Sequence, residues 1–228
     1  GNMIGAFYAY QKSVQRPIND VYYGPSFSNV DIKKVLDSLN LIYRYYPDIE
    51  KKTAELLSEG KVLANFKGRM EFGPRALGNR SILYRPDDPS VNTWLNKKLS
   101  RTEFMPFAPA TLYEDAEKYY NVIEGTKTSA QFMTITYECT PLSQRQQPAV
   151  VHLDNTARPQ LVREDLNPSF HRIINQFKEL TGIGSIINTS FNMHEEPIVC
   201  SPKEAILAFH QTKLDALILE NYLILQVE

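Results

Sequence analysis

The sequence of 228 residues is poor in cysteine, with only Cys139 and Cys200 and no close spacing between them. A disulfide framework or a zinc site needs more cysteines at a regular spacing, so this content indicates a reducing compartment, and we expect the cytoplasm. No apolar run reaches the roughly 18 residues that cross a bilayer. The N-terminus has no basic region followed by an apolar stretch, so the sequence predicts neither a membrane span nor a secretory signal.

An excess of charge of one sign is also missing. The formal net charge is −1, and the content of 43% hydrophobic and 22% charged residues is ordinary for a globular protein. Such a chain does not adhere to nucleic acid or anionic membranes through its overall field. Any anion site must therefore be built from a local group of side chains.

The opening of the chain resembles the end of a preceding domain followed by a connector. Residues 3–14 are predicted to form a short apolar helix, and Pro17, Gly24 and Pro25 mark a linker over residues 16–27. We therefore divide the chain into residues 1–46, the end of a preceding domain plus linker, and residues 47–228, the main domain.

The hydrophobic pattern predicts helices and strands that mix without strict alternation. Ser28 precedes a helix whose apolar face is expected to hold Val30, Val35, Leu36 and Leu39. Further helices are expected at residues 48–59, 89–99, 114–120, 169–181 and 201–211. Strands are expected at residues 61–66, 80–84, 107–112, 131–137, 149–153, 160–163, 184–188, 215–219 and 222–227, the last two as a hairpin. This order favours an α/β (α+β) fold, a mixed sheet flanked by helices.

Two glycines and one capping motif mark helix ends in this pattern. Gly60 and Gly182 stand where a C′ glycine ends a helix. Ser201 and Glu204, with proline between them at the first helical position, form the sequence of a capping box.

The most informative stretch is KGRMEFGPRALGNRS, which begins at Lys67. From Lys61 to Arg85 there are six basic residues and one acid, a local surplus of +5. Glycine permits positive φ and close approach of the backbone to a ligand, and arginine can grip phosphate oxygens in pairs. A solvated basic loop is the alternative, but such loops seldom contain Gly-Pro-Arg-Ala-Leu-Gly. We therefore predict a phosphate cradle that includes Arg69, Arg75 and Arg80.

Lys98 and Arg101 form a second basic cluster near the predicted end of a helix. Residues three apart lie on one helix face, so both could point at the same oxyanion. The alternative is that these cations complement the C-terminal end of the helix dipole.

A third cluster is His152-Leu153-Asp154-Asn155-Thr156-Ala157-Arg158, in which polar residues alternate. An extended chain would present His152, Asp154, Thr156 and Arg158 on one side. One histidine and one aspartate without a third ligand make a weak metal site, so we expect hydrogen bonds to a phosphorylated substrate instead.

The fourth stretch is a buried-type strand that ends in Asn188-Thr189-Ser190-Phe191-Asn192. Hydroxyl and amide groups at the end of such a strand are well placed to bind a small ligand, although a plain strand-to-loop cap is the alternative. No Gly-x-Ser-x-Gly elbow surrounds Ser190, which argues against a covalent nucleophile.

These stretches, with FMPFAPATL and EPIVCSPKEAI, resemble the C-terminal domain of carbamoyltransferases that act on nodulation factors, cephalosporins and aminoglycosides. The resemblance implies a YrdC-like fold, a twisted mixed sheet with helices, that combines carbamoyl phosphate and ATP into carbamoyladenylate. It also implies a sugar-kinase-like N-terminal domain with bound iron, which moves the carbamoyl group to a hydroxyl acceptor. Residues 3–10 look like the closing helix of that domain.

The family's functional residues match positions already noted. Lys98 and Arg101 resemble its lysine–arginine pair, although Ser100 stands where a lysine is usual, and Glu195 stands where the family has glycine. The resemblance implies catalytic roles for Lys98, Arg101 and Ser190. It implies substrate or nucleotide binding by a larger set: Arg69, Arg75, Arg80, His152, Thr156, Arg158, Thr189 and Asn192. No protein metal site is expected among them.

ATP and carbamoyl phosphate together carry roughly five to six negative charges, so several arginines and Mg²⁺ are expected to hold them. Two other classes of function remain open. YrdC-like folds can bind RNA, but the net charge of −1 and the lack of a long basic stripe argue against a nucleic-acid module. A non-catalytic domain that only caps a partner domain would bind no nucleotide.

Overall fold

The computed structural model describes residue 10 and residues 19–99, 107–193 and 195–226. Apart from residue 10, the helix predicted at residues 3–14 lies outside these ranges, and so does the first part of the predicted linker. Residues 19–27 have no regular secondary structure, as the linker prediction requires.

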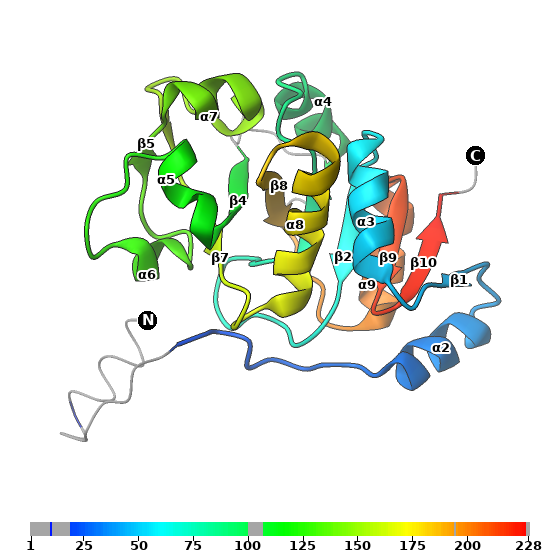
Figure 1. Cartoon of the computed structure of the whole chain (residues 1–228). Helices are drawn as coiled ribbons and strands as arrows, with labels where there is room; N and C mark the ends of the chain where they lie inside the picture. Colours follow the sequence, from blue (N-terminus) through cyan, green and yellow to red (C-terminus); the bar gives the residue numbers. More distant parts are fainter. Residues whose placement is uncertain (1–9, 11–18, 100–106, 194, 227–228) are drawn as a thin grey trace.

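A mixed eight-stranded sheet forms the centre of the molecule (Figure 1), in the order β1-β10-β9-β2-β3-β8-β4-β7. Within it, β2 pairs with β9 and β4 with β7 in parallel, while the other neighbours are antiparallel. The strands are β1 (Arg44–Tyr45), β2 (Leu63–Phe66), β3 (Arg80–Tyr84), β4 (Ala108–Leu112), β7 (Gln160–Val162), β8 (Ser185–Ser190), β9 (Ala216–Leu219) and β10 (Tyr222–Leu225). The predicted mixed sheet is therefore confirmed.

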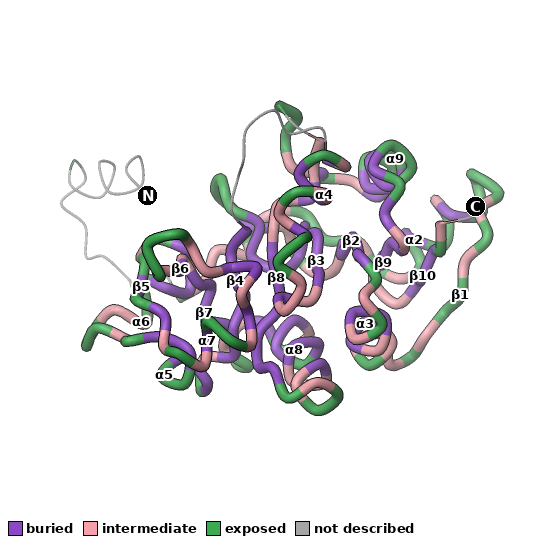
Figure 2. Tube along the Cα trace, turned by 90° about the horizontal axis from the view of Figure 1, so that it is seen from above, coloured by how far each residue is buried: buried purple, intermediate pink, exposed green. Residues whose placement is uncertain are grey.

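Helices cover both faces of this sheet (Figure 2). Successive strand residues point to opposite layers, because they belong to different core clusters. Ile186 packs with α3 (Ile49–Ser58) and α8 (Pro168–Thr181), whereas Ile187 packs with α2 (Asn29–Ser38), α4 (Val91–Lys98) and α9 (Pro202–Thr212). Two-sided burial explains why the central strands read as almost continuous apolar runs. Within the described ranges, no helix has the length and apolar content needed to cross a membrane.

Short elements form a separate lobe beside β4 and β7, seen in green in Figure 1. They comprise α5 (Ala116–Tyr119), α6 (Lys127–Ala130), α7 (Pro141–Gln146), β5 (Tyr137–Glu138), β6 (Thr156–Ala157) and the 3₁₀ turns Tyr113–Asp115 and Pro148–Val150. Most of their apolar side chains make a small core of their own around Tyr120 and Tyr137, whereas Ala149 and Val150 pack into the main core.

The strands predicted at residues 131–137 and 149–153 are wrong, and both errors fall in or beside this lobe. Met133 adopts a φ of 55°, which interrupts an extended chain, so only Tyr137 and Glu138 form a strand. Pro148 begins a 3₁₀ turn, and the N–H of Ala149 donates to the carbonyl of Pro86. Apolar content alone did not distinguish these turns from strands.

The predicted helix ends are confirmed where a cap defines them. Ser28 and Ser201 each form a capping box, and Gly182 ends α8 with a φ of 80°. The predicted apolar face of α2 is partly wrong, because Val30 and Leu39 are exposed. Its buried stripe instead consists of Ile32 and Leu36, four residues apart.

Gly78 sits where a larger residue cannot fit, and this gives a test of the packing. A Cβ there would lie 2.4 Å from the ring of Phe170, at a φ of 112°. We expect Gly78→Ala to lower the free energy of unfolding by about 2 to 4 kcal/mol, from overpacking and backbone strain together. Urea denaturation measures this change.

Gly73→Ala is the matched control, since Gly73 has a similar φ of 124° and a Cβ there would meet nothing within 4 Å. It should lose only the strain term, about 1 to 2 kcal/mol. Equal losses in the two variants would contradict the close approach of Phe170.

Candidate functional site

Four of the conspicuous segments of the sequence meet at one end of the sheet. Phe66, where β2 ends, pairs with Arg80, where β3 begins. Ser81 pairs with Ser190 at the end of β8. Ala108 on β4 pairs with Asn188 on β8. On its other side β4 pairs with β7, where Ala110 lies opposite Gln160. The loop of residues 67–79, here called the arginine loop, therefore lies near the end of β8 and the segment that leads into β7.

The arginine loop is folded around a buried carboxylate. Glu71 is 6% exposed, and its Oε1 accepts hydrogen bonds from the N–H groups of Leu77 (2.6 Å) and Asn79 (2.8 Å). Burial raises the pKa of Glu71, while these N–H donors and the charge of Arg80 oppose the rise. The loop thus has a polar centre in place of an apolar core.

Three buried amides complete the hydrogen bonding of the same backbone. The side chains of Asn65, Gln160 and Asn188, from β2, β7 and β8, donate to the carbonyls of Gly78 (2.6 Å), Leu77 (2.8 Å) and Ala76 (3.2 Å). Backbone outside helices and strands must find such partners when it is buried. The sequence analysis noted Asn188 only as part of a ligand-binding strand end and missed Asn65 and Gln160, although a polar residue inside an apolar strand is a signal that a partner is needed.

Arg80 was predicted to bind a ligand, but its guanidinium lies inside the protein. It is 0% exposed and donates to the carbonyls of Lys67, Gly68, Asn79 and Pro25 at 2.8 to 3.3 Å. It also lies 3.6 Å from the centre of the Phe66 ring, and burial lowers its pKa to about 10. These contacts give Arg80 the role of fastening the loop, because Nη1 and Nη2 already donate to four backbone carbonyls.

Arg69 also turns its donors to the backbone. Its Nε and Nη2 donate to the carbonyls of Gly24 (3.2 Å) and Tyr23 (2.9 Å), which tie the loop to the segment before α2. The side chain is exposed, so its ligand-binding role stays a prediction.

Arg75 and Arg158 bring two positive charges together without an acid. Arg75 is exposed at the tip of the loop, and Arg158 is half-buried just before β7. Burial, and then the charge of Arg75, lower the pKa of Arg158, because both disfavour another cation there. In the part of the chain that the structure describes, neither guanidinium has a hydrogen bond or an ion pair. Such a pair is suited to an anion.

The prediction that His152, Asp154, Thr156 and Arg158 share one side of an extended chain is wrong. Asn155 has a φ of 63°, and the N–H of His152 donates to the carbonyl of Thr156, so the segment turns back on itself. The Thr156 hydroxyl donates to Asp154 (2.7 Å) and lies 3.0 Å from Nδ1 of His152. These three side chains bond one another, and only Arg158 is left without a partner in the described structure.

The end of β8 presents small polar groups near the arginine loop. Ser190 is half-buried, and its hydroxyl makes no hydrogen bond to a described residue. Thr189 beside it is also half-buried. Asn192 uses its amide within its own loop, donating to the carbonyls of Met193 (2.7 Å) and Glu196 (2.9 Å). The ligand contacts of all three stay predictions.

Lys98 is the last residue of α4 and is half-buried. Arg101 lies outside the described residues, so the proposed pairing of these two cations stays a prediction. Among the residues that are described, no group of three His, Cys, Asp or Glu side chains could hold a metal ion.

The comparisons with known proteins show the family. Residues 54–226 match the family described as "Carbamoyltransferase C-terminus". The chain is similar to protein MJ1058 of Methanocaldococcus jannaschii (37% identity, 97% of this chain and 36% of that protein). It is also similar to nodulation protein NolO of Bradyrhizobium diazoefficiens (35% identity, 98% of this chain and 42% of that protein). A further relative is 3'-hydroxymethylcephem-O-carbamoyltransferase of Amycolatopsis lactamdurans (34% identity, 66% of this chain and 28% of that protein).

The chain therefore belongs to the carbamoyltransferase C-terminal family, as the motifs predicted. Three curated relatives match this chain over 89% to 100% of its length. The chain covers only 36% to 45% of the length of those relatives. Full-length HypF in its phosphate- and nucleotide-bound form has a similar fold, with a TM-score of 0.53 at 20% identity over 76% of this chain and 25% of that one. The predicted YrdC-like mixed α/β fold is confirmed.

Glu71 offers a direct test of how the arginine loop is held. Glu71→Ala leaves two buried N–H groups without an acceptor and should lower the free energy of unfolding by about 2 to 5 kcal/mol. Glu71→Gln keeps an acceptor oxygen and should lose much less. Urea denaturation of the two variants compares them, and equal losses would contradict the role of the Glu71 oxygen.

The pH dependence of the same site has a defined sign. Because the pKa of folded Glu71 is raised, its protonated form stabilises the fold below the ordinary pKa of glutamate, about 4. This stabilisation is lost as pH rises through the raised folded pKa. The free energy of unfolding therefore decreases with rising pH over this interval, which is a negative slope. Glu71→Gln should remove that slope in urea denaturation at a series of pH values.

Proposed function

We propose that this chain binds ATP and carbamoyl phosphate and forms carbamoyladenylate. The observation that carries the proposal is that the charge of Arg75 is felt at Arg158, while neither guanidinium has an acidic partner among the described residues. Two like charges are costly to hold together unless an anion joins them. The family, whose members include an O-carbamoyltransferase, supplies the class of anion.

The proposed reaction needs positioning more than a protein nucleophile. Hydrolysis of carbamoyl phosphate yields carbamate and phosphate; a carbamate oxygen then attacks the α-phosphorus of ATP, and the bond to the departing pyrophosphate breaks. Arg75 and Arg158 neutralise phosphate oxygens, and the hydroxyl of Ser190, which bonds no described residue, donates to another. The family resemblance implies catalytic roles for Lys98 and Arg101. Mg²⁺ would accompany the nucleotide, since the described residues offer no cluster for a resident ion.

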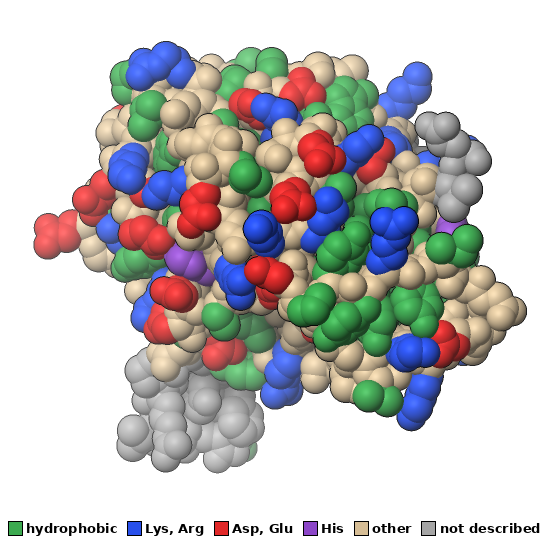
Figure 3. All heavy atoms as spheres, turned by 45° about the vertical axis from the view of Figure 1, so that its right-hand side comes forward, with side chains coloured by type: hydrophobic (Ala, Val, Ile, Leu, Met, Phe, Trp, Pro, Cys, Tyr) green, Lys and Arg blue, Asp and Glu red, His purple; other side chains and the backbone are tan. Residues whose placement is uncertain are grey.

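Transfer of the carbamoyl group to a hydroxyl acceptor is proposed for the protein as a whole. The family resemblance assigns this step, and the iron, to a sugar-kinase-like domain. An RNA-binding module is less well supported: basic and acidic side chains are interspersed on the face shown in Figure 3, which offers no continuous basic stripe.

ATP–pyrophosphate exchange tests the proposal. We expect the wild-type chain to exchange label only when carbamoyl phosphate is present. Arg158→Ala should lower the rate by roughly 10- to 100-fold, because it removes charge-assisted hydrogen bonds to phosphate. Arg158→Lys should recover part of the loss, since it restores the charge but not the planar fork.

Arg145→Ala is the control, because Arg145 lies on the distant helix α7, is exposed and makes no hydrogen bond or ion pair to a described residue. Its rate should equal that of wild type. Wild-type exchange without carbamoyl phosphate, or no exchange at all, would count against the proposal.

A further inference from the structure

Glu220 occupies a backbone conformation that suits glycine better than glutamate. It is the first of two residues between β9 and β10, whose ends pair as Leu219 and Tyr222, and its φ is 50°. A side chain at positive φ meets steric resistance, and tight hairpin turns usually place glycine or asparagine there. A glutamate that persists in this conformation points to a use for its side chain.

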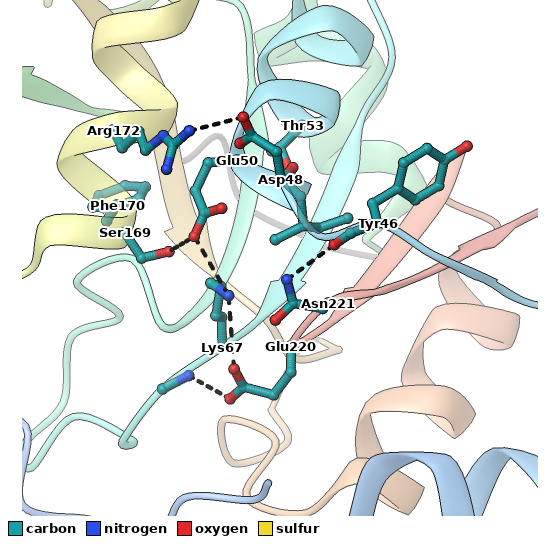
Figure 4. Close-up of polar contacts among 12 residues, drawn as sticks. Tyr46, Asp48, Glu50, Thr53, Lys67, Ser169, Phe170, Arg172, Glu220 and Asn221 are labelled. Atoms are coloured by element: carbon teal, nitrogen blue, oxygen red, sulfur yellow. Dashed lines mark hydrogen bonds and ion pairs between the residues drawn. The ribbon is translucent and has the colours of Figure 1, made fainter. Parts of the chain in front are cut away.

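The carboxylate of Glu220 reaches the start of the arginine loop (Figure 4). One oxygen accepts the N–H of Gly68 at 2.7 Å, and the other lies 3.7 Å from Nζ of Lys67. Lys67 also lies 3.4 Å from Glu50, which accepts the hydroxyl of Ser169 at 2.7 Å. The side chains of Lys67, Glu50 and Glu220 are only 12% to 15% exposed, so solvent screens these charges weakly.

The contact falls where the loop leaves the sheet. The carbonyls of Lys67 and Gly68 accept hydrogen bonds from Arg80, whereas the N–H of Gly68 is held by Glu220. The first loop peptides are therefore held from two sides, by a guanidinium on their carbonyls and by a carboxylate on an N–H. Gly68 itself has a φ of 66°, so its orientation depends on these contacts.

We propose that Glu220 is a positioning residue for the arginine loop: its carboxylate fixes the peptide of Gly68 and the side chain of Lys67, and thereby the direction in which the loop carries Arg75. Glu220 does not touch the ligand and acts through the loop. The effect on ligand binding rests on the proposed function, whereas the effect on the loop does not.

The test compares Glu220→Gly, Glu220→Gln and Lys213→Gly. Glu220→Gly relieves the backbone and removes the carboxylate, while Glu220→Gln keeps an oxygen for Gly68 but loses the charge beside Lys67. Lys213 is the matched control, since it is exposed, has the same φ of 50° and makes no side-chain contact to a described residue. Amide hydrogen exchange is followed in residues 68–73 and, in the same sample, in β9 and β10.

We expect exchange in the loop of Glu220→Gly to rise by about tenfold or more relative to β9 and β10, with a smaller rise in Glu220→Gln and none in Lys213→Gly. An unchanged loop, or an equal rise in the loop and the strands, would overturn the inference, the second because it reports general destabilisation. In the pyrophosphate exchange assay, the KM for ATP of Glu220→Gly should rise about tenfold with kcat less affected. A KM for ATP of Glu220→Gly equal to that of wild type would also overturn the inference. If the wild-type chain were inactive, the proposed function would be contradicted, and the hydrogen exchange of the loop alone would then test the role of Glu220.

Discussion

The hydrogen bonds from the backbone of Leu77 and Asn79 to the buried carboxylate of Glu71 are the interaction on which the candidate site depends. The segment around them is buried at the end of the sheet but belongs to no helix or strand, so its backbone groups cannot bond one another. Glu71 takes the N–H groups, and amides from neighbouring strands supply donors for the carbonyls. Because a buried peptide group without a partner is costly, these side chains allow one conformation of the loop and exclude most others.

The consequence of this arrangement is electrostatic. A loop fixed at its root by Arg80, and at its centre by Glu71, carries the exposed Arg75 toward Arg158 from a different part of the chain. A protein with a net charge of −1 thereby acquires a local concentration of positive charge. The arginines of this motif divide into those that hold the loop and those whose guanidinium groups have no partner among the described residues.

Much of the fold could be predicted because the signals are local. The capping boxes of Ser28 and Ser201, the glycine that ends α8 and the C-terminal hairpin each depend on a few neighbouring residues. Two predicted strands failed, at residues 131–137 and 149–153, because a positive φ at Met133 and a turn begun by Pro148 leave little trace in an apolar pattern.

The site could be predicted only as a set of segments. The motifs identified the family and the segments that the fold brings to one end of the sheet, but the role of each arginine depends on tertiary contacts. Arg80 and Arg75 belong to the same motif, yet one lies beneath the loop on four carbonyls and the other is exposed. The alternation of His152, Asp154 and Thr156 suggested one polar face, whereas hydrogen bonds within the segment fold it into a turn.

A crystal structure of the chain soaked with ATP and carbamoyl phosphate measures the central claim most directly. The account predicts density for a phosphate or carbamoyl group that both Arg75 and Arg158 contact, with the Ser190 hydroxyl nearby and Glu71 still bonded beneath the loop. Ligand density that touches neither guanidinium, or the two arginines turned to separate faces in the presence of ligand, would contradict it.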